Sequence, residues 1–280
     1  MRRSRRNGLL LSFCFLLITF STIEVKAQES RNSTSVISEA TVRDTSQPYY
    51  YRINKRYFSS IWDDFKQVAV SPLHWQGKDW AKFGVVMGGA AILTATADKP
   101  VKRMMLRNQK PAFKSVTDVF EPLGNRFGPL FITGMYLTGV ISGNRRIEHA
   151  SLSITRSLLI STVIYTASKA IINRQRPVRT DNPYDFRLPF TKQAKTYTSF
   201  PSGHSNTIFS IATACALEFK NQKWVPFVAY SIATLTAVSR VYQNRHWTSD
   251  ILVGASLGHF ITKKVYAVEE KKRATLKATY

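Results

Sequence analysis

Six apolar segments separated by polar loops constrain the fold of this chain more than any other feature of its sequence. They span residues 83–97, 127–141, 152–172, 204–219, 225–238 and 251–266. Their content of Gly, Ala, Ser and Thr suits close packing of helices, and no segment alternates polar and apolar residues as a strand would. The sequence therefore predicts an all-α fold, an antiparallel bundle of about six core helices.

The relationship of this bundle to a membrane is left open by the segment lengths. Most segments hold only about 15 apolar residues, whereas a membrane-spanning helix needs about 20. The mean hydropathy of the chain, −0.17, is low for a protein that crosses a membrane six times. Basic residues in the loop after the first segment and in the C-terminal tail would nevertheless fit the cytoplasmic side of a membrane. We expect a membrane partner, with embedding of the bundle as one of two alternatives.

The N-terminal residues are typical of an export signal. Four arginines within the first six residues precede an apolar run at 9–20, and Ala27 stands at a suitable cleavage position before Gln28. We therefore predict a signal peptide over 1–27 and export to the cell envelope. The rest divides into a linker with amphipathic helices (28–80), the core (81–266) and a basic tail (267–280).

Charge and cysteine content exclude several classes of protein. The chain carries a formal net charge of +23 and stays strongly basic without its first 27 residues. An exported protein seldom meets nucleic acid, and no basic module with interleaved aromatic residues is present. An anionic membrane surface or an anionic substrate therefore explains the charge better. Cys215 is the single thiol after the signal, so no internal disulfide is expected, and no cluster has metal-ligand spacing.

Basic residues and a helix start flank the long loop after the third segment. Lys169 and Arg176 are two helical turns apart and would share a helix face, while Pro177 turns Arg176 into the loop. Pro201, Ser202, Gly203 and His204 then open the fourth segment. Free backbone N–H groups at a helix start bind phosphate, and a glycine lets an anion approach the backbone closely.

A second histidine opens the last segment. His246 and Asp250 are four residues apart, so the carboxylate is expected to accept the Nδ1–H of the imidazole and leave Nε2 free as a nucleophile. In an antiparallel bundle, the ends of the third and fifth segments and the starts of the fourth and sixth lie on one side. Lys169, Arg176 and Arg240 should therefore meet both histidines there, as phosphoryl transfer requires.

These residues also carry a family resemblance. The pattern Lys169-x6-Arg176-Pro177, then Pro201-Ser202-Gly203-His204, then Ser239-Arg240-x5-His246-x3-Asp250 resembles the three-part signature of the phosphatidic acid phosphatase type 2 and vanadium haloperoxidase superfamily. The resemblance covers about residues 83–266 and leaves the first 80 residues outside. No signature position departs from the family pattern.

The resemblance implies a role for each signature residue. His246 would attack phosphorus to form a phosphohistidine, Asp250 would orient it, and His204 would protonate the leaving oxygen and then activate water. The remaining residues would hold the phosphoryl oxygens: Lys169, Arg176, Ser202, Gly203 and Arg240. The family implies no metal and no cofactor, and vanadate is expected to act as an inhibitor.

The function implied by this resemblance is that of a phosphomonoesterase or pyrophosphatase acting on a lipid-like phosphoester, with a periplasmic active site. One alternative is a soluble, broad-specificity periplasmic acid phosphatase. A vanadium-dependent haloperoxidase and a non-enzymatic anion-binding protein are further alternatives. Signal cleavage conflicts with an external active site if every segment spans the membrane, because three spans would place the end of the third segment inside the cell. The oligomeric state is left open.

Overall fold

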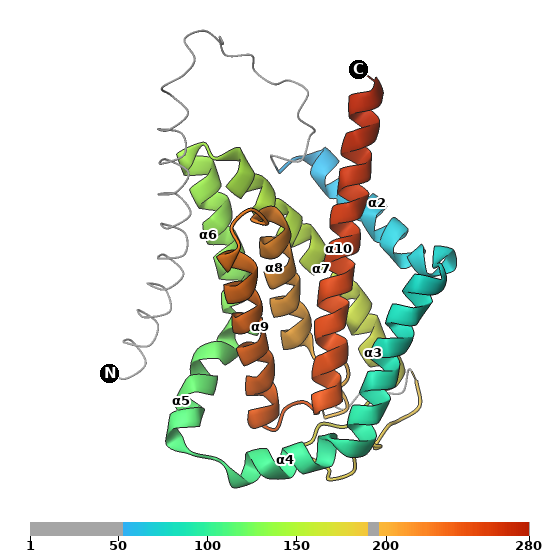
Figure 1. Ribbon diagram of the computed structural model, residues 1–280, viewed down its shortest axis with the longest axis vertical. Coiled ribbons are helices and arrows are strands. Elements are labelled where there is room, and N and C mark those ends of the chain that lie inside the picture. The colour runs from blue at the N-terminus through green and yellow to red at the C-terminus, as the bar shows by residue number, and fades with distance from the viewer. Residues whose placement is uncertain (1–52, 190–195, 280) are drawn as a thin grey trace.

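The computed structural model describes residues 53–189 and 196–279, and most of these residues are helical (Figure 1). The core helices are α3 (Gly77–Thr96), α6 (Phe127–Ser142), α7 (Arg145–Ile172), α8 (Gly203–Glu218), α9 (Trp224–Tyr242) and α10 (Thr248–Thr279). Each of them contains most of one predicted apolar segment. The predicted all-α bundle of about six core helices is therefore confirmed. The predicted signal peptide and the linker as far as residue 52 lie outside the described residues.

Shorter helices cover the flank and one end of the bundle. They are α2 (Lys55–Ala69), η2 (Ser71–His74), α4 (Asp98–Arg107), α5 (Pro111–Phe120) and η3 (Glu121–Gly124). Helix α2 packs against α10 and α7. Helix α4 runs across the end where α9 turns into α10, and α5 lies beside the same end of α9 (Figure 1). The residues predicted as a basic tail continue α10 as far as Thr279. Val268 and Glu269 are buried there, so this part of α10 belongs to the packed core.

Helix α7 ends earlier than the position of Pro177 suggests. Its first turn is capped by Asn144, whose side chain accepts hydrogen bonds from two backbone N–H groups. Its last residue is Ile172, because Asn173 adopts the left-handed conformation with φ of 40°. Asparagine tolerates this conformation better than most residues and commonly ends helices in it. The loop that carries Arg176 therefore leaves α7 four residues before Pro177.

Two glycines set the closest contact between helices α8 and α10. A Cβ atom on Gly254 would lie 2.4 Å from the carbonyl oxygen of Ser202, and one on Gly258 would lie 2.4 Å from that of Asn206. Small residues four positions apart allow two helix backbones to approach closely. This contact fixes the start of α8 against the start of α10, which is where the signature residues lie.

A buried charge cluster joins four helices, α2, α7, α8 and α10, at the other end of the bundle. Arg156 of α7 is 1% exposed, and its guanidinium lies 3.1 Å from Asp64 of α2 and 3.5 Å from Glu269 of α10. His149, one of the histidines outside the signature, pairs with Glu218 at 3.2 Å and also contacts Glu269. Charged groups at this depth require partners, so the cluster fastens α2 and the end of α10 to α7.

Helices α7 and α9 are long and apolar enough to cross a membrane. Helices α3 and α4 would add a third span if the pair, bent by 57°, were counted as one. The other described helices fall short by length or composition. The structure thus retains the mixed character of the sequence, with some segments suited to a bilayer and others shorter or more polar.

Candidate active site

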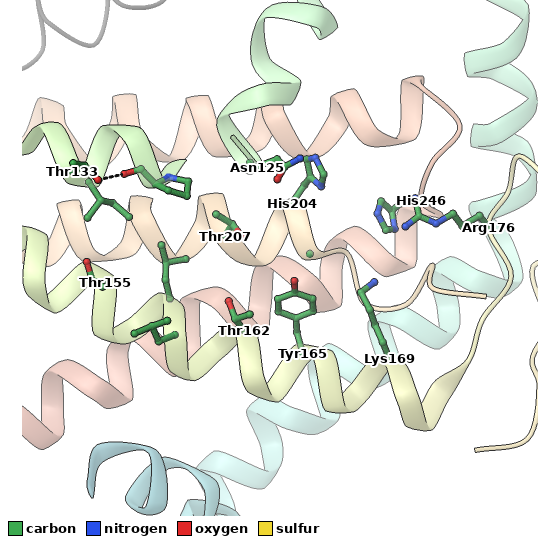
Figure 2. A pocket seen from close by; sticks show the side chains of 16 residues that line it. Asn125, Thr133, Thr155, Thr162, Tyr165, Lys169, Arg176, His204, Thr207 and His246 are labelled. Atoms are coloured by element: carbon green, nitrogen blue, oxygen red, sulfur yellow. Dashed lines mark hydrogen bonds between the residues drawn. The ribbon is translucent and has the colours of Figure 1, made fainter. Parts of the chain in front are cut away.

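The signature residues come together around a cavity of 560 Å³ at the α4–α5 end of the bundle (Figure 2). Five of them line it: Lys169, Arg176, Gly203, His204 and His246. Helix α7 supplies the lysine at its end, α8 supplies Gly203 and His204 at its start, and the turn before α10 supplies His246. The antiparallel arrangement brings these helix ends to the same side, as the sequence predicts.

His246 is held by a backbone carbonyl and not directly by Asp250. Its Nδ1 atom lies 2.7 Å from the carbonyl oxygen of Ser199 and 3.7 Å from Oδ2 of Asp250. The expected hydrogen bond from Nδ1 to the carboxylate is therefore absent. His246 precedes the first residue of α10, so the pair does not share a helix face. A carbonyl oxygen only accepts hydrogen bonds, which places the proton on Nδ1 and leaves Nε2 unprotonated.

The carboxylate of Asp250 is instead part of the frame around His246. Its Oδ2 atom accepts hydrogen bonds from the Ser199 hydroxyl at 2.6 Å and from the backbone N–H of Trp247 at 2.9 Å. As an acidic residue in the first turn of α10, Asp250 reaches back over the helix start and satisfies a free N–H group. Ser199 thus connects the two predicted residues, accepting from His246 and donating to Asp250.

A buried ion pair continues this frame into helix α4. Arg174 is 1% exposed and donates to Oδ1 of Asp250 at 2.7 Å and to Oδ2 of Asp98 at 2.7 Å. Asp98 also accepts from the backbone N–H of Ser249 at 2.9 Å. Sequence reasoning missed Asp98, Arg174 and Ser199. Nothing in their spacing marks them, because the contacts arise only where α4 and the loop before α8 meet the start of α10.

The surroundings of His246 keep its imidazole neutral. The pKa of His246 is lowered to about 3, chiefly by burial and also by the nearby Lys169 and Arg176, against the opposing effect of Asp250. Two cations next to a neutral imidazole form an electrophilic pocket with a free nitrogen lone pair. Such a pocket is suited to an anionic electrophile, because the cations would neutralise its charge while Nε2 attacks.

Lys169 and Arg176 are oriented by the loop that leads into α8. The ammonium group of Lys169 donates to the carbonyl oxygens of Thr198 at 2.6 Å and Pro201 at 2.7 Å. Arg176 donates to the hydroxyl of Thr198 at 3.1 Å. Both cations therefore bind the segment from Thr198 to Pro201. Both also line the cavity, close to His246 (Figure 2).

Ser202 and Gly203 form the start of α8. The Ser202 side chain caps the helix by accepting from the backbone N–H of Ser205 at 3.3 Å, and it is fully buried. Its place is thus behind the cavity wall, whereas the resemblance implied contact with phosphoryl oxygens. Gly203 lines the cavity, and a Cβ atom there would lie 3.2 Å from the ring of Tyr165. Because Gly203 has no side chain, there is room for the Tyr165 ring, and the helix start stays open to an anion in the cavity.

Arg240 reaches the site through Glu121, which sequence reasoning missed. A single carboxylate oxygen, Oε1 of Glu121, lies 2.9 Å from Nη1 of Arg240 and 3.0 Å from Nε2 of His204. Arg240 also donates to the side chain of Gln243 at 2.7 Å. Arg240, the third predicted cation, is therefore linked to His204 through the carboxylate of Glu121. Glu121 follows α5 and carries no spacing relative to the signature that would mark it.

The other end of the cavity has a different character. Helices α6, α7 and α8 line it there with aliphatic side chains and threonines: Pro129, Ile132, Leu158, Leu159, Thr133, Thr155, Thr162 and Thr207. In Figure 2, Thr133 and Thr155 lie at the end far from His246. The cavity thus joins a cationic, histidine-bearing end to a mainly apolar one. Within the described residues, no three His, Cys, Asp or Glu side chains gather as a metal site would require.

Comparison with known proteins finds one family whose sequence model covers most of the residues of this site. Residues 150–274 match the sequence model of the PAP2 superfamily. Asp98 and Glu121 lie outside the matched range. The lipid A 1-phosphatase of Porphyromonas gingivalis is 38% identical over 73 residues, which cover 26% of this chain and 16% of that protein. The undecaprenyl-diphosphatase of Sulfolobus acidocaldarius is 29% identical over 118 residues, covering 42% of this chain and 54% of that protein.

The fold has a solved counterpart. The crystal structure of a transmembrane PAP2 type phosphatidylglycerolphosphate phosphatase from Bacillus subtilis superposes with a TM-score of 0.55 and 24% identity, covering 70% of this chain and 98% of that one. The chain thus shares its bundle with a protein solved as a membrane phosphatase. It spans less than two thirds of the length of both sequence relatives.

Proposed function

We propose that this chain is a member of the PAP2 superfamily, whose sequence model matches residues 150–274, and that it is a phosphoric ester hydrolase that removes phosphate from a lipid-like phosphoester. The observation that carries this proposal is the two-ended cavity. One end holds His204, His246, Lys169 and Arg176, and the other is lined by Ile132, Leu158 and Leu159. A phosphate group bonded to an apolar chain matches both ends, whereas a small soluble ester would leave the apolar end unfilled.

The proposed chemistry follows from the geometry of His246. Its Nε2 lone pair attacks phosphorus while the bond from phosphorus to the leaving oxygen breaks, which forms a phosphohistidine. Lys169 and Arg176 neutralise the phosphoryl oxygens, together with backbone N–H groups at the start of α8. His204 supplies the proton that the leaving oxygen takes up. The same residue then accepts a proton from the water that cleaves the nitrogen–phosphorus bond and releases phosphate.

A membrane setting fits this substrate class. The cavity opens among α6, α7 and α8, and α7 is one of the helices suited to a bilayer. We propose an exported or membrane-embedded enzyme of the cell envelope. The end of the bundle that carries His204 and His246 would face the periplasm. Labelling of a Leu188→Cys variant in intact cells with an impermeant maleimide tests this orientation, since Leu188 is 76% exposed on the loop at the cavity end. Labelling only after cell lysis would reverse the proposed orientation.

A phosphate-release panel tests the proposed substrate class. The purified protein should release phosphate faster, at equal concentration, from detergent-dispersed phosphatidic acid, phosphatidylglycerol phosphate, undecaprenyl pyrophosphate or lipid A than from small sugar phosphates. Equal or greater release from the soluble esters would favour the broad-specificity acid phosphatase instead. Extraction of the protein from membranes by carbonate without detergent would point in the same direction.

A further inference from the structure

Glu121 is an acid in contact with the proposed proton donor. It begins η3, directly after α5, and its side chain is 28% exposed. One oxygen accepts from both Nε2 of His204 and Nη1 of Arg240, at 3.0 Å and 2.9 Å. One carboxylate thus joins a histidine and a guanidinium. Glu121 lies outside the residues that match the family model, whereas His204 and Arg240 lie within them.

The charges around His204 oppose the role that the reaction demands of it. A group that protonates the leaving oxygen must hold a proton when substrate is bound. The pKa of His204 is lowered to about 4, chiefly by burial and also by Arg240 and Arg176, while Glu121 opposes this shift. The charged or titratable side chains at this end of the cavity come from six elements: Glu121 from η3, Tyr165 and Lys169 from α7, Arg176 from its loop, Arg240 from α9, Arg245 and His246 from the turn before α10, and Asp250 from α10. Glu121 is the acid that contacts His204, whereas Asp250 lies behind His246.

We propose that Glu121 is a positioning residue that keeps a proton on His204 for transfer to the leaving oxygen and fixes Arg240 beside it. The inference rests on the proposed phosphatase function. The carboxylate accepts from Nε2, so Nδ1 is the nitrogen that serves the leaving oxygen. An imidazolium next to a carboxylate forms a charge-assisted hydrogen bond, which stabilises the protonated ring among surrounding cations. The incoming phosphoryl dianion adds to this effect.

A comparison of leaving groups separates proton donation from simple structural support. The substrates are p-nitrophenyl phosphate, whose phenolate leaves without a proton, and an alkyl phosphate, whose alkoxide needs one. The measured quantity is kcat/KM, because it reports steps up to departure of the leaving group and excludes hydrolysis of the phosphohistidine. For Glu121→Gln we expect kcat/KM for the alkyl ester to fall by about 100-fold, the range of general acid catalysis. The value for the aryl ester should change by less than about threefold.

Two further variants serve as controls. Asp118→Asn removes a carboxylate one turn earlier on α5, where Asp118 pairs with Lys114 at 3.5 Å, and should leave both kcat/KM values at the wild-type level. Glu121→Asp retains the charge on a shorter side chain and should restore part of the activity on the alkyl ester. Thermal unfolding of each variant shows that it is folded.

The outcomes are distinguishable. An equal loss on both esters would make Glu121 a structural tether and overturn the inference. Unchanged activity on both esters would also overturn the inference. A gain on both esters would overturn it too, and would show that the Glu121 carboxylate hinders binding of the anion. Wild-type protein that releases phosphate neither from these two esters nor from the dispersed lipid phosphates would overturn the proposed function, and the inference with it.

Discussion

The Nδ1 atom of His246 lies 2.7 Å from the carbonyl oxygen of Ser199, and this contact determines which nitrogen of the ring is available for chemistry. A carbonyl cannot donate a hydrogen bond, so Nδ1 carries the proton and Nε2 carries the lone pair. Asp250 acts on the ring indirectly, because its carboxylate accepts a hydrogen bond from the hydroxyl of Ser199 at 2.6 Å. Loss of His246 and disturbance of its frame should therefore have different effects.

Replacement of His246 by alanine should abolish phosphate release. The variant lacks the proposed nucleophile but keeps the frame formed by Arg174, Asp250 and Ser199, so it should remain folded. We expect a loss of more than about 1,000-fold in kcat on the best lipid phosphate, as for removal of other catalytic nucleophiles. His74→Ala is the matched control, because His74 is exposed on η2. A folded His246→Ala protein with near wild-type activity would refute the assignment.

Acid should destabilise the protein partly through His246. Burial holds the pKa of this imidazole at about 3 in the folded state, against an ordinary value of 6.5. Between these values the unfolded chain binds a proton that the folded chain does not, so the free energy of unfolding falls as pH decreases from 6.5 toward 3. The thermal midpoint of wild type should drop more steeply from pH 6.5 to 4.5 than that of His246→Ala. Parallel curves would contradict the buried, neutral imidazole.

Breaking the ion pair between Asp98 and Arg174 should destabilise the fold strongly. Both side chains are buried, and Asp98→Asn would leave the guanidinium with one carboxylate partner, Asp250, in place of two. The expected loss is about 3–5 kcal/mol in the free energy of unfolding. Asp63→Asn removes an exposed carboxylate that pairs with Lys66 at 2.9 Å and should change the free energy of unfolding little, because solvent screens such a pair. Similar unfolding midpoints for the two variants would show that the buried pair adds little.

An alanine at Gly254 should separate α8 from α10. The new Cβ atom would meet the carbonyl oxygen of Ser202 at 2.4 Å, so the start of α8 would have to shift. We expect loss of phosphatase activity and a lower unfolding midpoint. Gly84→Ala on α3 meets nothing within 4 Å and should stabilise its helix by up to about 1 kcal/mol. Full activity of Gly254→Ala would indicate that the two helices are not held as closely as described.

Vanadate should inhibit phosphate release. It resembles the five-coordinate phosphoryl group, and Nε2 of His246 with Lys169 and Arg176 would bind it in place of substrate. Inhibition should be competitive with substrate and weaker in Lys169→Met, which lacks one of the cations. A halide-oxidising activity that requires added vanadate and peroxide would support the haloperoxidase alternative in its place.

The helices were accessible to sequence reasoning because their apolar residues repeat with the helical period. The ends of the helices were harder to predict from the sequence. The end of α7 depends on the backbone of Asn173, and no periodicity reports a single left-handed residue. The length of α10 depends on Glu269, a charged residue that suggests solvent in sequence but is buried against Arg156 and His149. Such pairing between distant helices is invisible in a local pattern.

The sequence by itself determined the bundle and placed Lys169, Arg176, Gly203, His204 and His246 at helix ends on one side, because spacing and helix direction suffice for that. Only the tertiary structure decided how these side chains are held. Ser199 binds His246, Arg174 ties Asp250 to Asp98, and Glu121 joins His204 to Arg240. Each of these contacts joins segments tens of residues apart, and their distances and burial arise only when α4, α5 and the loop before α8 fold over the end of the bundle.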